Sequence, residues 1–398
     1  MTQMDNTVMI RLSGRIDSAN SAEIENDILK QLEGKTDTAV TLDVEELEYI
    51  SSAGLRVILR VKKTWPDVRV INASPEVYEI LETTGFTEMM TVEKAYKVIS
   101  VEGCEVIGEG FNGKVYRVDK DNVVKVYKNA DALADIQHER EVARLALILG
   151  VPTAISYDVV KVGDSYGSVF ELLNARSFAK ILADEPERMD WCVTEYINLL
   201  KKVHGITVPE GKLPSSKEKI VKWENEIRAD LPEAESRKLE QLIAGMPDSD
   251  HMIHGDYHTK NIVLAGDEVL LIDMDTLCAG YPIYELAQMY NSYIGFSEYN
   301  PEIVRDFQGF SPETARTFWH KCLQAYFETE DEEKLKKLED KIRCVSYTRL
   351  ISWKYRHPSN NSEEDKVTAE LWKSHLSELL ERVDSLSFED GDTDAQGG

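Results

Sequence analysis

The sequence predicts two domains of mixed class, a small α/β domain in residues 1–100 and a larger, two-lobed α+β domain in residues 101–385. Three observations carry this prediction. The chain has 398 residues, more than one globular domain usually holds. Strand and helix patterns alternate through the first hundred residues. Beyond them, short strand patterns come first and long amphipathic helix patterns follow, which is typical of an α+β domain.

The charge of the chain excludes several classes of partner. Lys and Arg number 46 and Asp and Glu 72, so the formal net charge is −26. Such acidity repels phosphate backbones and anionic lipid, and we therefore expect neither nucleic acid nor a membrane as a partner. The five Cys are scattered without metal-ligand spacing, and no signal peptide or membrane-spanning apolar run is visible. We expect a cytoplasmic protein.

The first domain alternates between strand and helix patterns. Period-two alternation predicts strands at residues 8–12, 39–44 and 68–71. Apolar residues at helical spacing predict helices at residues 19–32, 53–61, 75–83 and 91–100. Strands that alternate with helices favour a small sheet with crossover helices.

A short polar segment joins the second strand to the second helix. It reads Tyr-Ile-Ser-Ser-Ala-Gly-Leu-Arg in residues 49–56. This segment resembles the signature of STAS domains, the anti-sigma factor antagonist modules, and the resemblance covers nearly all of residues 1–100. In that family a Ser at the helix N-terminus is phosphorylated, and the phosphate switches protein binding. The resemblance implies that Ser52 is the phospho-acceptor and that the domain binds a protein partner.

The same segment has a simpler interpretation as a helix cap. A phosphate at a helix N-terminus meets unpaired backbone N–H groups and the positive end of the helix dipole. Ser51 or Ser52 can equally be an ordinary N-cap, because Ser often fills that position. Both interpretations stay open from the sequence.

The second domain begins with a Gly-rich segment, GEGFNGKVY in residues 108–116. Strand patterns at residues 114–118 and 123–127 surround a turn, so the segment belongs to a β-hairpin and not to the strand–turn–helix of a dinucleotide fold. The candidate phosphate-binding residues of the segment are Gly108, Gly110 and Gly113. Glycines allow backbone N–H groups to approach a phosphate closely.

Lys125 lies in the middle of the second apolar strand of this hairpin. A Lys in such a strand needs a partner, and its place after the Gly-rich segment favours contact with a nucleotide phosphate. The helix pattern at residues 130–149 offers Glu139 and Glu141 as ion-pair partners. We favour Glu141 and retain Glu139.

The most specific segment of the chain reads HGDYHTKN in residues 254–261. Asp256 and Asn261 have the spacing of a phosphotransferase catalytic loop, in which a carboxylate takes the acceptor proton and an amide oxygen binds Mg²⁺. Asp273 ends the next apolar strand, where a second carboxylate can bind the same ion. Asp275 either assists the metal or the acceptor or is simply solvated.

Together these motifs resemble the superfamily of aminoglycoside phosphotransferases, choline kinases and fructosamine kinases, which shares the protein-kinase-like fold. The resemblance implies ATP and Mg²⁺ as cofactors, with Asp256 as catalytic base. It further implies Asn261 and Asp273 as Mg²⁺ ligands, and Lys125 with Glu141 as the pair at the ATP phosphates. We place the first lobe at residues 101–174, the second at 175–385, and an acidic, disordered tail at 386–398.

Two further segments carry the same resemblance. Residues 170–173, Phe-Glu-Leu-Leu, resemble the hinge that receives the adenine edge, which implies nucleotide contacts from Glu171 and Leu173. Residues 280–287 resemble a family segment that normally has Asp where this chain has Glu285. That difference concerns a structural contact and not the chemistry.

Amphipathic helix patterns at residues 215–244, 314–326, 332–351 and 363–383 surround the predicted site in the sequence. In the superfamily such helices wall the acceptor pocket. The aromatic residues of this region either form a cage for a cation or, more often at this spacing, a core. They are Trp319, Tyr347, Trp353, Tyr355 and Trp372. The surplus of acid favours a cationic acceptor.

Two functions from different classes follow. The first is an ATP- and Mg²⁺-dependent kinase for a hydroxyl or amino group of a small molecule, with the STAS domain as regulator. The alternative is a partner-switching signalling protein whose kinase domain phosphorylates Ser52 or a protein partner.

Overall fold

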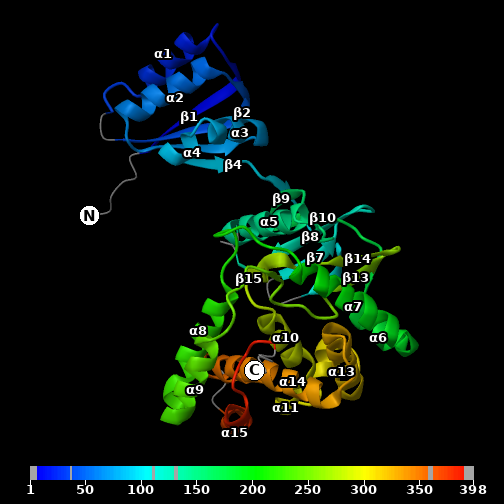
Figure 1. The fold of residues 1–398 in the computed structure, drawn as a ribbon. Coiled ribbons are helices and arrows are strands. Elements are labelled where there is room, and N and C mark those ends of the chain that lie inside the picture. The colour runs from blue at the N-terminus through cyan, green and yellow to red at the C-terminus, as the bar shows by residue number, and fades with distance from the viewer. Residues whose placement is uncertain (1–6, 36–37, 110–112, 130–132, 357–361, 390–398) are drawn as a thin grey trace, which may run out of the picture. The chain divides into compact units, whose positions relative to one another are not determined.

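The computed structural model describes residues 7–35, 38–109, 113–129, 133–356 and 362–389 (Figure 1). The chain divides into two compact units. The first unit comprises Met1–Val118, Val124–Ala132 and Tyr157–Val169, and the second comprises Asp119–Val123, Leu133–Ser156 and Phe170–Gly398. The first unit holds two sheets with separate apolar cores, and the second holds most of the helices.

A four-stranded parallel sheet in the order β1-β2-β3-β4 begins the first unit. Its strands are β1 (Thr7–Ile16), β2 (Ala39–Ile50), β3 (Val68–Ala73) and β4 (Thr91–Lys94). The helices between them are α1 (Ser21–Gln31), α2 (Ser52–Thr64), α3 (Pro75–Thr83) and α4 (Phe86–Met89). The core forms because the apolar residues of β2 from Val40 to Ile50 are buried and α2 buries one face against the sheet. The predicted α/β domain with crossover helices is confirmed.

The predicted last helix at residues 91–100 is wrong. This segment forms two short strands, β4 and β5 (Lys97–Ile99), which join different sheets. β4 pairs with β3, while β5 pairs with β9 (Asp158–Val162), both in parallel. The β-branched residues of the segment suit strands, and the partner strands complete the backbone hydrogen bonds that a ten-residue helix would supply only weakly by itself.

A six-stranded sheet follows in the order β5-β9-β10-β8-β7-β6. Its other strands are β6 (Glu105–Glu109), β7 (Gly113–Arg117), β8 (Asn122–Tyr127) and β10 (Ser165–Glu171). β7 and β8 are neighbours, as the predicted hairpin requires. The core of this sheet is small and rests on Val124, Val160 and Val169.

The second unit is largely helical. Its helices are α5 (Leu133–Ile148), α6 (Phe178–Asp184), α7 (Met189–His204), α8 (Ser216–Ile227), α9 (Glu233–Ala244), α10 (Ile283–Tyr290), α11 (Phe296–Tyr299), α12 (Ile303–Gln308), α13 (Pro312–Phe327), α14 (Glu332–Arg356) and α15 (Glu363–Arg382). Its strands are β11 (Ala175–Ser177), β12 (Met252–Ile253), β13 (Ile262–Ala265), β14 (Glu268–Leu271) and β15 (Cys278–Ala279). The predicted helical pair at residues 215–244 and the three later helices are present. Among the described residues no helix is long and apolar enough to cross a membrane.

Candidate active site

The segment between β12 and β13 is a tight loop whose shape depends on a glycine. Gly255 has φ +87°, a conformation that side chains other than Gly rarely adopt. A Cβ at this position would also lie 2.6 Å from the carbonyl oxygen of Thr276. The Thr276 hydroxyl in turn donates a hydrogen bond of 2.8 Å to the carbonyl of His254. The loop therefore packs backbone against backbone, and only Gly fits between His254 and Asp256.

A buried carboxylate on α10 accepts backbone hydrogen bonds from this loop. Glu285 is fully buried, and its Oε2 accepts the backbone N–H of His254 at 2.5 Å. Its Oε1 accepts the N–H of Gly255 at 3.0 Å. His204, buried on α7, lies with Nε2 3.9 Å from Oε2 of Glu285 and with Nδ1 2.8 Å from the hydroxyl of Tyr326. Glu285 thus accepts the N–H groups of two successive residues of the loop.

Three polar side chains meet at the loop. The carboxylate of Asp256 has Oδ2 3.3 Å from Nε2 of His258, and half of the Asp256 side chain is exposed. Asn261 donates from Nδ2 to the backbone carbonyl of Asp256 at 2.9 Å. The loop therefore presents one accessible carboxylate on a fixed backbone, with an amide beside it.

The charge state of Asp256 follows from its neighbours. Burial by itself raises the pKa of this carboxyl, but a hydrogen bond with His258 and electrostatic interactions with His258, His254 and Arg349 lower the pKa to about 2. The carboxylate is therefore anionic at neutral pH. An anion in this position can orient a hydroxyl group and accept its proton.

The predicted metal ligands lie at one end of the β13–β14 hairpin. The backbone N–H of Ile272 donates to the carbonyl of Asn261 at 2.9 Å, which places Asp273 next to Asn261 across the hairpin. Asp273 has φ +67°, a strained backbone conformation for a residue other than Gly. Because Nδ2 of Asn261 donates to Asp256, its amide Oδ1 is the atom left to bind a cation. An amide oxygen with a carboxylate suits Mg²⁺, a hard cation. Within the described ranges no group of three or more His, Cys, Asp or Glu could hold a metal.

The Gly-rich hairpin belongs to the first unit. β6 and β7 pair antiparallel, with Gly108 opposite Val115. A Cβ on Gly113 would lie 2.2 Å from the carbonyl oxygen of Val126, so this position has no room for a side chain. Gly110 lies outside the described residues. Lys125 is half-buried on β8, with Nζ 5.2 Å from the ring centroid of Tyr127.

The other predicted nucleotide residues differ in burial. On α5 the side chain of Glu139 is buried and that of Glu141 is exposed. Glu171 is exposed at the end of β10, and Leu173 is partly buried just beyond it. The backbone N–H of Leu172 donates to the carbonyl of Asp121 at 2.7 Å, which fixes this segment to the β7–β8 turn.

The two candidate serines of the first domain have distinct places. Ser51 is the N-cap of α2, and its Oγ accepts the N–H of Ala53 at 3.2 Å. Ser52 is the first residue of the helix and is exposed. Gly54 is required for packing, since a Cβ there would lie 2.7 Å from the side chains of Ile16 and Ile50.

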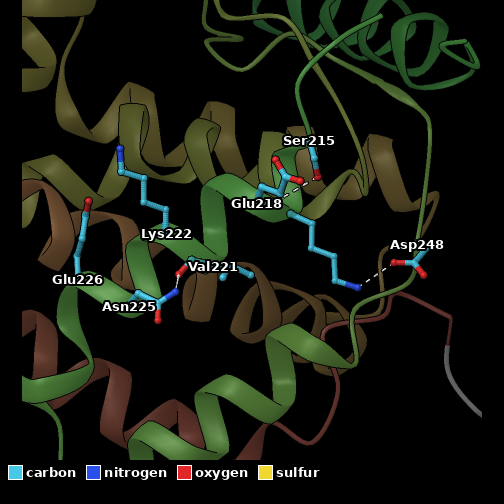
Figure 2. Close-up of a pocket in the computed structure, with 8 residues that line it drawn as sticks. Ser215, Glu218, Val221, Lys222, Asn225, Glu226 and Asp248 are labelled. Atoms are coloured by element: carbon cyan, nitrogen blue, oxygen red, sulfur yellow. Dashed lines mark hydrogen bonds and ion pairs between the residues drawn. The ribbon is translucent and has the colours of Figure 1, made fainter. Parts of the chain in front are cut away.

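Most of the candidate aromatic cage is core. Trp319, Tyr347 and Trp372 are buried, and Tyr355 is exposed. A surface hollow of about 830 Å³ runs along α8 (Figure 2). The residues that line it are Ser215, Lys217, Glu218, Val221, Lys222, Asn225, Glu226 and Asp248. Since none of the predicted site residues is among these, the hollow is not the catalytic cleft.

Sequence reasoning missed Arg349 and Lys219. Arg349 lies on α14, beside the ring of Trp223 and within electrostatic range of Asp256. Lys219 lies on α8 and donates from Nζ to the Thr276 carbonyl at 3.4 Å. In the sequence each is one basic residue in an amphipathic helix, and no signal marks it as different from a surface residue.

Comparisons with known proteins agree with both domains. The STAS domain model matches residues 1–99, and the model of the phosphotransferase enzyme family matches residues 103–318, more than half of the chain. A protein of Bordetella bronchiseptica that is named as an anti-sigma factor antagonist, BtrV, is 35% identical over 96 residues, which are 23% of this chain and 82% of that protein.

Two solved structures are among those similar to this chain. A choline/ethanolamine kinase family protein from Mesorhizobium loti is 14% identical, covers 70% of this chain and 88% of its own, and has a TM-score of 0.44. The aminoglycoside phosphotransferase APH(2'')-Ib with bound ADP is 14% identical, covers 78% of this chain and 98% of its own, and has a TM-score of 0.45. The chain belongs to the phosphotransferase enzyme family and carries a STAS domain on the N-terminal side of its kinase-like domain.

Proposed function

We propose that the protein is a kinase that transfers the γ-phosphoryl group of ATP to a hydroxyl or amino group of a small molecule. The observation that carries the proposal is the catalytic loop. Its backbone is fixed by Gly255 and Glu285, and it presents the anionic carboxylate of Asp256 beside Asn261. Phosphoryl transfer needs positioning and charge neutralisation more than covalent chemistry. A loop with a fixed backbone supplies the positioning.

The residues of the chain have separate parts in this reaction. Asp256 orients the acceptor hydroxyl and takes its proton as the acceptor oxygen bonds to the γ-phosphorus. The bond from that phosphorus to the bridging oxygen breaks, and ADP leaves with the electron pair. Mg²⁺, held by Asn261 and Asp273, would neutralise charge on the phosphates.

On the nucleotide side we propose the Gly-rich hairpin, Lys125 and the hinge with Glu171 and Leu173. Glu141 and Glu139 both stay candidates for the ion-pair partner of Lys125, and their burial on α5 distinguishes them. A buried carboxylate must be paired to be stable, whereas an exposed one gains little from a pair. In these assignments Lys125 and backbone N–H groups contact the ATP phosphates. The positive charge that ATP meets is local, so the net negative charge of the chain does not prevent its binding.

The experiment compares the wild-type protein with Asp256→Asn. We expect calorimetry to give equal affinities for Mg²⁺·ADP, because the amide keeps the size of the side chain. Product formation over a panel of metabolites should fall by about 100- to 10,000-fold. Wild-type protein that binds no nucleotide would refute the proposal, and so would unchanged turnover in Asp256→Asn.

A second function is favoured by one observation. Ser52 is exposed at the first position of α2, with Ser51 as the cap behind it. A phosphate on Ser52 would lie at the positive end of the helix dipole. We therefore propose the STAS domain as the regulatory, partner-binding module, with Ser52 as its phosphorylated residue. Mass spectrometry after incubation with ATP and Mg²⁺ tests whether the kinase domain is the source. Phosphate on Ser52 that disappears in Asp256→Asn supports self-phosphorylation, and unmodified Ser52 refutes it.

A further inference from the structure

A cationic side chain lies among aromatic rings close to the catalytic loop. The guanidinium carbon of Arg349 on α14 is 6.0 Å from the ring centroid of Trp223 on α8 and 5.9 Å from that of Phe296 on α11. The ring of Trp223 stacks on Tyr284 of α10, with centroids 5.3 Å apart and an interplanar angle of 16°. Four helices of the second unit thus contribute to one aromatic surface, and the Arg349 guanidinium lies against it.

Arg349 has no ion pair in the part of the chain that the structure describes, and the carboxylate that its charge does reach is Asp256. No carboxylate lies within ion-pair distance of its guanidinium, and it makes no hydrogen bond to a described residue. The contrast with Arg356 is direct, because that residue lies two turns further along α14. Arg356 pairs with Glu226 of α8 at 3.0 Å. Among the described residues, Glu226 therefore pairs with Arg356, and no carboxylate forms an ion pair with Arg349.

A second cation lies on the same side of the site. Nζ of Lys219 donates to the carbonyl of Thr276 at 3.4 Å and is 5.7 Å from the ring centroid of Tyr284. That carbonyl is the one that faces Gly255 of the catalytic loop. No carboxylate of the described residues lies within ion-pair distance of Lys219. Both cations are partly buried, so solvent screens them less than it screens a surface Lys or Arg.

Both cations also relate directly to the reactive carboxylate. Arg349 is one of the groups whose charge lowers the pKa of Asp256. Lys219 contacts the Thr276 carbonyl, and Gly255 of the Asp256 loop packs against that same carbonyl. Removing a cation from water without a counter-ion is unfavourable, and proteins usually avoid it by pairing. Among the described residues neither Arg349 nor Lys219 has such an ion pair.

We infer that the acceptor is an anionic small molecule, an alcohol with a carboxylate or phosphate group that Arg349 and Lys219 bind while its hydroxyl meets Asp256. This inference rests on the proposed kinase function and names the substrate class of the same site. A guanidinium forms paired hydrogen bonds with a carboxylate or phosphate, and an ammonium adds a point charge. The stacked rings of Trp223 and Tyr284 are buried, and they pack α8 against α10 beside the two cations.

The anion also has a chemical role in the reaction. The acceptor hydroxyl gives its proton to Asp256, its oxygen bonds to the γ-phosphorus, and ADP leaves with the electrons of the broken bond. An anionic acceptor would be repelled by Asp256 and by the triphosphate unless its own charge were neutralised. Arg349 and Lys219 provide that neutralisation. The inferred anionic acceptor differs from the cationic acceptor expected from the sequence, because Arg349 lies within electrostatic range of Asp256 and Lys219 contacts the Thr276 carbonyl beside the loop.

The test first separates nucleotide binding from acceptor binding. The full chain is saturated with Mg²⁺ and a non-hydrolysable methylene analogue of ATP, and binding of that analogue is measured by calorimetry. Inorganic phosphate and malonate are then titrated into the complex as anionic probes, with glycerol and ethanolamine as neutral and cationic probes. We expect the anions to bind and the other two not to bind. Absence of analogue binding refutes the kinase proposal itself. Normal analogue binding without anion binding overturns only the acceptor inference.

Matched variants locate the anion. Arg349→Gln should weaken anion binding by about 10- to 100-fold, as expected for the loss of charged hydrogen bonds. Arg356→Gln removes the same charge from the same helix and should leave the affinity unchanged. Lys219→Gln and its neighbour Lys222→Gln form a second pair on α8, so the test does not depend on the folding of one variant. Equal effects within either pair would overturn the assignment of that residue.

Turnover gives an independent measurement. A panel is assayed for ADP release with hydroxy acids, phosphorylated alcohols, neutral polyols and amino alcohols. We expect activity with one of the first two classes, and the active class identifies the carboxylate or the phosphate as the bound group. With that acceptor, Arg349→Gln should raise KM and leave kcat largely intact. Activity only with polyols or amino alcohols would overturn the inference. A fall in kcat at constant KM would do the same, because Arg349 would then act on Asp256.

Discussion

The carboxylate of Glu285 accepts a hydrogen bond from the backbone N–H of Gly255, with Oε1 3.0 Å from the amide nitrogen. The other carboxylate oxygen accepts the N–H of His254. One buried side chain on α10 thus satisfies two successive amides of the loop between β12 and β13.

We expect Glu285→Gln to destabilise the second unit. The amide that replaces the carboxylate has one acceptor oxygen, so one of the two loop N–H groups loses its partner inside the protein. The cost should be about 1–3 kcal/mol in the free energy of unfolding, measured by urea denaturation. Glu302→Gln is the control, because this exposed residue pairs with the exposed Arg305 and should change stability by less than about 0.5 kcal/mol. Equal stability of the two variants would contradict the role of Glu285.

Gly255→Ala should be more harmful than a substitution at another glycine with positive φ. Gly266, in the β13–β14 turn, has φ +62° and open space around its Cα. Both variants have the backbone strain, about 1 kcal/mol, but only at Gly255 does the new Cβ collide with a carbonyl. We expect Gly266→Ala to remain active and Gly255→Ala to lose both stability and turnover. Thermal unfolding and ADP release measure the two effects, and similar losses in both variants would contradict this prediction.

The pH dependence of the site follows from the lowered pKa of Asp256. A carboxyl with a folded-state pKa of about 2, below its ordinary 3.8, stabilises the folded state above the unfolded pKa and loses that contribution as the pH falls toward 2. Asp256 therefore contributes no acid limb to activity between pH 5 and 8. His258→Leu should raise the pKa of Asp256, because Leu can neither donate a hydrogen bond to the carboxylate nor interact with its charge. A carbon NMR titration of the carboxyl group measures both values. A pKa of 5 or more in the wild-type protein would contradict the assignment.

Local chemistry explains which parts of the fold and the site could be predicted. The spacing of Asp256, Asn261 and Asp273 follows from one loop and one hairpin, since the N–H of Ile272 pairs with the carbonyl of Asn261. Residues 91–100 could not be predicted in the same way. Their apolar spacing fits a helix, but two strands from different sheets supply partners that the local pattern does not contain.

Tertiary packing determines the rest. Glu139 and Glu141 are two residues apart on α5 and so point to opposite sides of the helix. Only the folded structure says which side is buried. Arg349 and Arg356 are both basic residues of α14, and their difference depends on which of them Glu226 of another helix reaches. The sequence pattern of one helix does not show which of its residues a side chain of another helix contacts.

Substitution of the two serines should separate the helix cap from the exposed position. Ser51 accepts the N–H of Ala53, so Ser51→Ala should cost about 1 kcal/mol of unfolding free energy in the first domain. The side chain of Ser52 is exposed and is not the cap, so Ser52→Ala should change stability by less than about 0.5 kcal/mol. Urea denaturation followed by amide exchange in α2 measures both. A larger loss in Ser52→Ala than in Ser51→Ala would reverse the two roles.

The residue at which a truncated kinase-like domain begins should determine how stably that domain folds. The phosphotransferase family model begins at residue 103, but the six-stranded sheet includes β5, which pairs with β9. Only Ala95 and Tyr96 lie between β4 and β5, and the Tyr96 ring contacts that of Tyr166 on β10. A chain that begins at residue 101 lacks β5 and leaves β9 as a longer open edge, which favours aggregation.

We therefore expect a chain that begins at residue 96 to be more soluble and more stable than one that begins at residue 101. Size-exclusion chromatography and thermal unfolding measure the difference. Val98→Pro in the full chain is the matched variant, because Pro cannot donate a hydrogen bond to the sheet and disfavours the extended pairing of β5. It should lower the unfolding temperature of the six-stranded sheet, as we expect for the chain that begins at residue 101. If both truncated chains behave alike and Val98→Pro is neutral, β5 adds nothing to the kinase-like domain, and the STAS domain is joined to it by a simple tether.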